Sequence, residues 1–244
     1  MADSHYRWWL DYWAGTRGAD WPDESDGRAD LPAIYRHQAR VLDWLTEGRS
    51  VHRVLELGCG DGRLYDSLDR PWQEYWGVDF RVAEIEAFRI RHPELRLYDA
   101  DAATFRVDQR FDLIFSVAMI QYFDLDMLRL HLENAHAMLA DDGVLVLADF
   151  AWKSHQLQSL LVASGSVVRS HSMSELKERL RDIAQSRHMR AYSRSQLTAF
   201  AADAGFDIEF FGSFIIPGYL TARMTKAGAS RHCPPRAPAR IHIA

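Results

Sequence analysis

The chain has 244 residues, a length that suits one α/β domain with additions. Its net charge of -5 argues against nucleic acid or an anionic membrane as the main partner, because both require a basic face. No apolar run approaches the roughly 20 residues that span a bilayer, and the N-terminal residues lack the basic and apolar regions of a signal peptide, so a cytoplasmic protein is expected. The two cysteines, Cys59 and Cys233, are too few for a disulfide framework or a four-cysteine zinc site, and no metal is expected.

Residues 1–49 predict a helical cap before the main domain. Apolar and aromatic side chains recur at near-helical spacing over residues 4–14, which predicts a short amphipathic helix. After a loop, Asp30 is expected to cap a second helix that ends at Gly48. The aromatic side chains either pack against the core or form a lid over a substrate pocket. The candidate substrate contacts in this segment are Trp9, Tyr12 and Trp13.

Residues 53–62 are an apolar run that ends in three glycines spaced two residues apart. They predict a buried strand, a glycine-rich turn below a small molecule and the start of a helix over residues 63–70, because glycine admits positive φ and close ligand approach. The dinucleotide fingerprint G-x-G-x-x-G needs its third glycine where this chain has Arg63. The observed G-x-G-x-G, with an acid two places before it, resembles motif I of class I S-adenosylmethionine (SAM) methyltransferases. The resemblance makes candidate cofactor contacts of Glu56, Gly58, Cys59, Gly60, Asp61 and Gly62.

Two further acids extend this resemblance. Asp79 closes the second expected strand, 17 residues after Gly62, near the spacing of about 20 for a carboxylate that binds ribose hydroxyls. After the third expected strand, class I methyltransferases often carry an acid that reads the adenine amino group. Asp101 is the choice for that role and Asp99 is the alternative. The neighbouring candidate cofactor contacts are Phe80 and Ala102.

Residues 111–120 are nearly all apolar, as a central parallel strand covered on both faces should be, and they resemble motif IV. Where many relatives carry histidines after this strand, the chain has Gln121-Tyr122-Phe123, which argues against proton abstraction by a histidine here. The chain also lacks the Asn-Pro-Pro-Tyr type of sequence of many nucleic-acid amino-methyltransferases, which favours a small-molecule acceptor. Ser116 and Tyr122 are candidate cofactor contacts, and Tyr122 is also a candidate catalytic residue.

A helix over residues 124–140 is expected next, closed by a glycine cap at Gly143, and the histidines on it are interpreted as packed or solvated. A fifth strand follows over residues 144–150. Ligands in such sheets lie outside the carboxyl ends of the strands. The end of this strand should therefore line the substrate mouth, with Asp149 as a candidate catalytic residue and Trp152 as a candidate substrate contact.

Residues 153–192 are too long for a simple strand-to-helix connection and are interpreted as a substrate-side insertion. Its ionisable candidates are His155 for catalysis, His171 for substrate contact, and Arg169. A capping box at Ser193 then begins a helix, and two strands follow before a loose tail over residues 227–244. This ending resembles the C-terminal hairpin that separates methyltransferases from dehydrogenases.

The resemblance covers residues 50–226 and implies a Rossmann-like α/β fold: a seven-stranded sheet, mostly parallel, with a C-terminal antiparallel hairpin and helices on both faces. It implies SAM as cofactor, S-adenosylhomocysteine (SAH) as product, and methyl transfer to an O or N atom of a small organic acceptor. Two alternatives stay open: an NAD-dependent oxidoreductase and a catalytically silent SAM-binding subunit. The acceptor, the use of a general base and the oligomeric state are not predicted.

Overall fold

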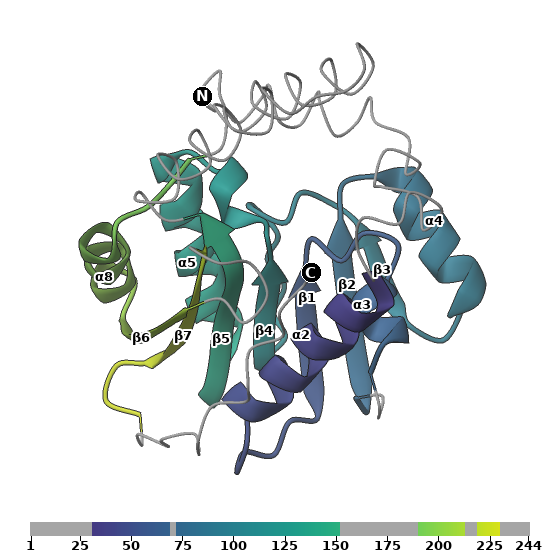
Figure 1. The fold of residues 1–244 in the computed structure, drawn as a ribbon, viewed down its shortest axis with the longest axis horizontal. Coiled ribbons are helices and arrows are strands. Elements are labelled where there is room, and N and C mark those ends of the chain that lie inside the picture. The colour runs from purple at the N-terminus through teal and green to yellow at the C-terminus, as the bar shows by residue number, and fades with distance from the viewer. Residues whose placement is uncertain (1–30, 69–71, 152–189, 213–218, 230–244) are drawn as a thin grey trace, which may run out of the picture.

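A computed structural model of the chain describes residues 31–68, 72–151, 190–212 and 219–229. Its centre is one seven-stranded sheet in the order β3-β2-β1-β4-β5-β7-β6 (Figure 1). The first five strands in this order pair in parallel, and β7 pairs antiparallel with both β5 and β6. The expected fold class is confirmed. The strands are β1 (Arg53–Leu57), β2 (Glu74–Asp79), β3 (Arg96–Asp99), β4 (Phe111–Val117), β5 (Leu139–Ala151), β6 (Phe206–Gly212) and β7 (Tyr219–Lys226).

Helices cover both faces of the sheet. Side chains of α2, α3 and α4 pack on one face together with Val54, Leu113 and Val146, and those of α5 and α8 pack on the other, as Figure 1 shows for α2 and α3 in front of the strands. Both faces of the central strands are therefore buried under helices, which explains why residues 111–117 are nearly all apolar. The helices are α2 (Leu31–Leu45), α3 (Arg63–Asp66), α4 (Val82–Arg91), α5 (Leu125–Met138) and α8 (Arg194–Asp203), with a 3-10 turn at Ile120–Tyr122.

The capping box predicted at Ser193 is confirmed. The Ser193 hydroxyl accepts a hydrogen bond from the Gln196 backbone N–H, and the Gln196 side chain accepts one from the Ser193 N–H. The helix then ends before Gly205, whose φ is +84°. Within the described residues, no helix has the length and apolar character that crossing a membrane requires.

The glycine cap predicted at Gly143 is wrong. Helix α5 ends at Met138, and the chain passes directly into extended backbone at Leu139, so Gly143 lies inside β5. A Cβ at Gly143 would stand 2.8 Å from Cγ of Leu139 and 3.0 Å from the Ala140 carbonyl oxygen. Glycine is required there by close packing rather than by a left-handed turn.

Two predicted elements are also shorter than expected. Helix α3 spans only Arg63–Asp66, and residues 69–70 of its predicted length lie outside the described part of the chain. Strand β4 ends at Val117 rather than at residue 120, because the next residue, Ala118, has φ +51°. This left-handed residue turns the chain out of the sheet at the edge where a ligand is expected.

Candidate functional site

The glycine turn after β1 is folded against the end of β2. The N–H groups of Gly58 and Cys59 both donate to the Val78 carbonyl, at 2.7 and 3.0 Å. Gly62 has φ +84°, and a Cβ on it would stand 2.4 Å from the ring of Phe88 on α4. The third glycine is therefore needed both for its backbone conformation and for packing. A Cβ at Gly58 would stand 2.9 Å from Sδ of Met119, and one at Gly60 would stand 3.1 Å from Nη2 of Arg81.

Asp79 ties the end of β2 to this turn. Its carboxylate is buried, with 6% of the residue exposed. Oδ2 accepts a hydrogen bond from the Gly60 N–H at 2.9 Å, and Oδ1 accepts one from the Arg81 N–H at 3.0 Å. The Arg81 guanidinium, 3.4 Å from the same Oδ1, also reaches Glu84. The Asp79 carboxylate thus contacts the middle glycine of the turn, Gly60.

Glu56, near the end of β1, is a second buried carboxylate at the turn. It is 4% exposed, and its Oε2 accepts a hydrogen bond from the hydroxyl of Tyr75 on β2. Burial raises the pKa of Glu56 to about 8; the Tyr75 hydrogen bond opposes this shift and the charge of Asp79 adds to it. Among the described residues, no lysine or arginine forms an ion pair with Glu56. The sheet therefore holds a carboxylate whose ionisation a cationic ligand would favour.

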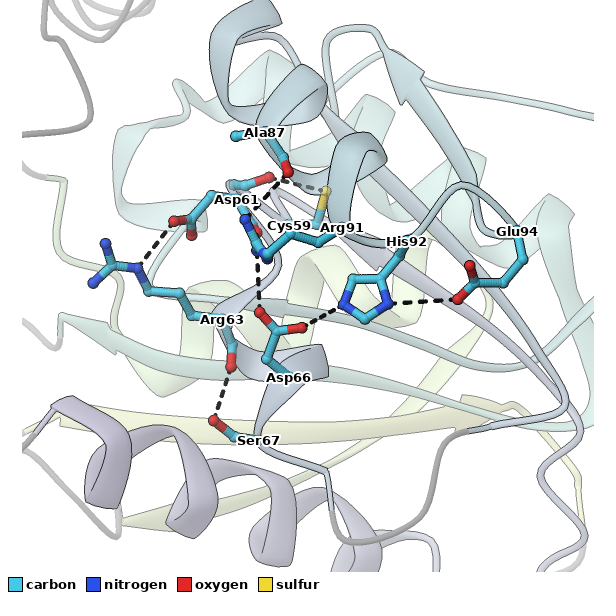
Figure 2. A network of polar contacts seen from close by, with 10 residues as sticks. Cys59, Asp61, Arg63, Asp66, Ser67, Ala87, Arg91, His92 and Glu94 are labelled. Carbon is cyan, nitrogen blue, oxygen red and sulfur yellow. Dashed lines mark hydrogen bonds and ion pairs between the residues drawn. The ribbon is translucent and has the colours of Figure 1, made fainter.

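A network of charged side chains supports the outer side of the turn (Figure 2). Arg91, at the end of α4, donates to the Asp61 carbonyl and to the Asp66 carboxylate. His92 meets the other oxygen of Asp66 at 2.6 Å, and Arg63 pairs with the Asp61 carboxylate at 3.0 Å. Helix α4 is thereby connected to both ends of the short α3, which fixes a helix too short to hold its own position.

The loop after β3 is held by its own aspartate and by α5. Oδ1 of Asp101 accepts a hydrogen bond from the Ala103 N–H at 2.9 Å. His131 of α5 lies 3.2 Å from the Ala102 carbonyl, and Asn134, one turn later, donates to the Thr104 carbonyl at 3.4 Å. Burial lowers the pKa of His131 to about 4, so its ring is neutral at pH 7. The interpretation of His131 as a packed residue is consistent with this arrangement.

Two non-glycine residues with positive φ lie side by side where β4 and β5 end. Ala118 and Asp149 both have φ +51°, and the Ala118 N–H donates to the Ala148 carbonyl at 2.9 Å. Such backbone costs about 1–3 kcal/mol per residue and is found at functional sites. Asp149 is 4% exposed, and its Oδ2 accepts a hydrogen bond from Gln38 of α2 at 3.1 Å. A small cavity beside it is lined by Gln38, Val41, Leu42, Val117, Ala148, Asp149 and Thr221.

A family described as "Methyltransferase domain" matches residues 30–209, more than half of the chain. The chain belongs to this methyltransferase family. Curated relatives include trans-aconitate 2-methyltransferase of Methylobacterium radiotolerans, 34% identical over 117 residues, and malonyl-[acyl-carrier protein] O-methyltransferase of Bacillus cereus, 30% identical over 108 residues. These matches cover 46% and 43% of this chain but only 44% and 39% of the relatives, so less than half of the length of each is matched.

The fold is shared with solved methyltransferase structures. Magnesium protoporphyrin IX methyltransferase (ChlM) of Synechocystis PCC 6803, solved with bound SAM, has a TM-score of 0.62 at 13% identity, over 93% of this chain and 99% of that chain. At this level of identity the similarity concerns the fold alone.

The structure brings most of the sequence-predicted residues of this chain together at one edge of the sheet. Glu56, the glycine turn and Asp79 meet through the contacts above, and Asp99 lies opposite Asp79 in the register of β2 and β3. Ser116 is 1% exposed in β4, and its hydroxyl has no hydrogen-bond partner among the described residues. Phe80 and Tyr122 are partly exposed at the same edge. The predicted residues Trp9, Tyr12, Trp13, Trp152, His155, Arg169 and His171 lie outside the described residues.

Sequence reasoning missed Tyr35, a residue of α2 that lies close to the glycine turn. Burial raises the pKa of Tyr35, and the charges acting on it come from Arg63, Asp61, Glu56 and Arg81. A tyrosine on an amphipathic helix gives no signal of this position in the sequence, because helical periodicity predicts which face is buried and not which end meets a loop.

No group of three or more His, Cys, Asp or Glu side chains that could hold a metal ion occurs within residues 31–68, 72–151, 190–212 and 219–229.

Proposed function

We propose that the protein is a SAM-dependent methyltransferase that moves a methyl group to an O or N atom of a small organic acceptor. The observation that carries this proposal is the convergence of two buried carboxylates, Glu56 and Asp79, on one glycine turn in a chain of the methyltransferase family. SAM supplies an electrophilic methyl group on a sulfonium, which joins a methionine chain that carries an ammonium to a ribose that carries the adenine.

The charges and hydrogen-bonding groups at the glycine turn suit the parts of SAM. The turn presents backbone without a Cβ at its glycines, beside the side chains of Met119 and Arg81. Glu56 is a buried carboxylate with no cationic partner among the described residues, as the methionine ammonium requires. Asp79 offers two charged acceptor atoms for the ribose hydroxyls. We assign the adenine to the loop of Asp101 and Ala102, which α5 holds in place. Phe80, Ser116 and Tyr122 complete the proposed cofactor contacts.

The acceptor side is proposed at the ends of β4 and β5. In-line placement of the nucleophile can supply much of the rate by proximity, and only an acceptor that must lose a proton needs a base. Tyr122 and Asp149 are the candidates among the described residues, and His155 is the candidate in the insertion. The proposed substrate contacts are Trp9, Tyr12, Trp13, Trp152 and His171. That the partner is a small molecule rather than nucleic acid or a membrane, and that the location is cytoplasmic, stay predictions.

The chemistry of the named relatives narrows the first acceptors to test. Trans-aconitate is a carboxylic acid, and a malonyl group carries a free carboxyl. A carboxylate is already deprotonated at neutral pH and needs no base, which suits a chain with Gln121-Tyr122-Phe123 after β4. Carboxylic acids therefore come first in the panel, followed by phenols and amines.

The test is transfer of a deuterated methyl group from labelled SAM to this panel, followed by mass spectrometry of acceptor and SAH. A labelled product with stoichiometric SAH supports the proposal. SAM binding without turnover on any acceptor supports a silent subunit instead, and binding of NADH without binding of SAM supports an oxidoreductase.

A further inference from the structure

Tyr75 reaches Glu56 across two neighbouring strands. In the parallel register of β1 and β2, Tyr75 pairs with Val54 and Gly77 pairs with Glu56. A Cβ at Gly77 would stand 3.2 Å from Cε1 of Tyr75 and 2.9 Å from Sγ of Cys59. The missing side chain at Gly77 thus leaves room for the tyrosine ring beside the glutamate.

The position of the Tyr75 hydroxyl is fixed by the packing of its ring. Tyr75 is 2% exposed, with the ring centroid of Tyr65 at 4.7 Å, that of Phe88 at 6.0 Å and that of Trp72 at 6.1 Å. Aromatic rings in such a cluster have little freedom to turn away. The hydroxyl therefore has one place to donate its proton, and Oε2 of Glu56 occupies it.

We propose that Tyr75 is a positioning residue that fixes the Glu56 carboxylate and favours its charged form for the ammonium of SAM, so that SAM binding is accompanied by release of a proton from Glu56. This inference rests on the proposed function, because it takes the ammonium to lie at Glu56. The proton leaves the carboxylic acid for the buffer, and the ion pair of carboxylate and ammonium replaces it.

The charged and titratable groups around Glu56 support this account. Asp79 raises the pKa of Glu56, and the electrostatic neighbourhood also includes Cys59 in the turn and Tyr35 on α2. Arg81 is turned to Asp79 and Glu84. Tyr75, which lowers the pKa of Glu56, is the group that opposes the dominant effect of burial.

The sign of the pH dependence follows from this balance. With a pKa near 8 in the free protein, most Glu56 side chains carry a proton at pH 6–7.5. Binding that requires the carboxylate then tightens as pH rises, by about tenfold per pH unit below the pKa. Removal of the Tyr75 hydroxyl raises the pKa further and weakens binding at every pH in that range.

The experiment is isothermal titration calorimetry of the full chain with SAM and with 5′-methylthioadenosine, which lacks the ammonium, over pH 6.0–7.5. Two buffers of different ionisation enthalpy report the released proton. For the wild type we expect the SAM Kd to fall about tenfold per pH unit, close to one proton to be released near pH 7, and a pH-independent Kd for 5′-methylthioadenosine. These wild-type results test the proton release without any variant.

Tyr75→Phe keeps the ring and removes the hydroxyl, and Tyr65→Phe is its matched control from the same aromatic cluster. We expect Tyr75→Phe to weaken SAM binding about tenfold or more, with less than a twofold change for 5′-methylthioadenosine, and Tyr65→Phe to change neither. A SAM Kd that does not vary with pH in the wild type, or equal SAM affinities in the two variants, overturns the inference.

Glu56→Gln separates this inference from the proposed function. If that variant binds SAM as the wild type does, the assignment of the ammonium to Glu56 is wrong, and the role of Tyr75 falls with it. If Glu56→Gln weakens SAM binding and abolishes the pH dependence while Tyr75→Phe has no effect, the proposed site stands and only the role of Tyr75 is refuted.

Discussion

Replacement of Asp79 by asparagine tests the proposed ribose site most sharply. The substitution keeps the shape but turns one of the two acceptor oxygens into a donor. In the structure both oxygens are in use, one by the Gly60 N–H at 2.9 Å and one by the Arg81 N–H at 3.0 Å. The new amide must therefore place an N–H against another donor, which costs about 1–3 kcal/mol of stability when buried.

The effect on ligand binding is expected to be similar in size to the effect on folding. A hydrogen bond to a charged group is worth about 1.5–3 kcal/mol, so loss of one such bond to a ribose hydroxyl weakens SAM binding by about 10- to 100-fold. Calorimetry with SAM and SAH measures this, and denaturant unfolding measures the stability. Asp112→Asn is the matched control, because the carboxylate of Asp112, at the start of β4, also accepts hydrogen bonds from two backbone N–H groups and lies outside the proposed site, so it should change the Kd less than twofold. An unchanged SAM affinity in Asp79→Asn would refute the ribose assignment.

Three further predictions concern the turn, the core and the acceptor side. Gly62→Ala should lower the free energy of unfolding by about 2–4 kcal/mol in denaturant titrations, because positive φ and contact with Phe88 both oppose a Cβ. Gly228 also has positive φ but has open space around it, so Gly228→Ala should lower the free energy of unfolding by only about 1–2 kcal/mol. His131 should contribute a loss of about 3 kcal/mol of stability between pH 6.5 and pH 4, because its pKa is depressed to about 4 in the folded state and the unfolded chain binds the extra proton. The raised pKa of Glu56 changes the total stability in the opposite direction, so the His131 contribution is measured as the difference between the wild type and His131→Gln in pH-dependent unfolding. Asp149→Asn should lower kcat at least tenfold for an acceptor that must lose a proton, with the SAM Kd within twofold of the wild type.

Each of these predictions has a result that contradicts it. Equal destabilisation of Gly62→Ala and Gly228→Ala would mean that Phe88 moves aside without cost. The same pH dependence in His131→Gln as in the wild type would place the responsible proton on another group. An unchanged kcat in Asp149→Asn would remove Asp149 from the list of candidate bases.

The sequence predicted the fold because its signals are local, and the residues proposed for the cofactor side of the site come from the same kind of local pattern. The strand, the spaced glycines and the acid at residue 79 are contiguous patterns, and the capping box at Ser193 is a four-residue pattern with its own hydrogen bonds. The end of α5 was not predictable in the same way. Gly143 resembles a helix cap in the sequence, whereas its actual role is set by contact with Leu139.

Contacts between strands escaped sequence reasoning for a similar reason. The pairing of Tyr75 with Glu56 depends on the register of β1 and β2 and on the space at Gly77, none of which a linear pattern contains. The positive φ of Ala118 and Asp149 was also unforeseen, because non-glycine residues rarely adopt it, even though aspartate does so more often than most. It depends on how β4 and β5 end beside each other.

The central claim is that SAM lies on the glycine turn between Glu56 and Asp79. A crystal structure of the protein with SAH tests this most directly. The account predicts that the ribose hydroxyls contact the Asp79 carboxylate and that the ammonium contacts Glu56, with the Tyr75 hydroxyl still donating to that carboxylate. Density for SAH away from the turn, or an ammonium directed to solvent while Glu56 stays covered, would contradict it.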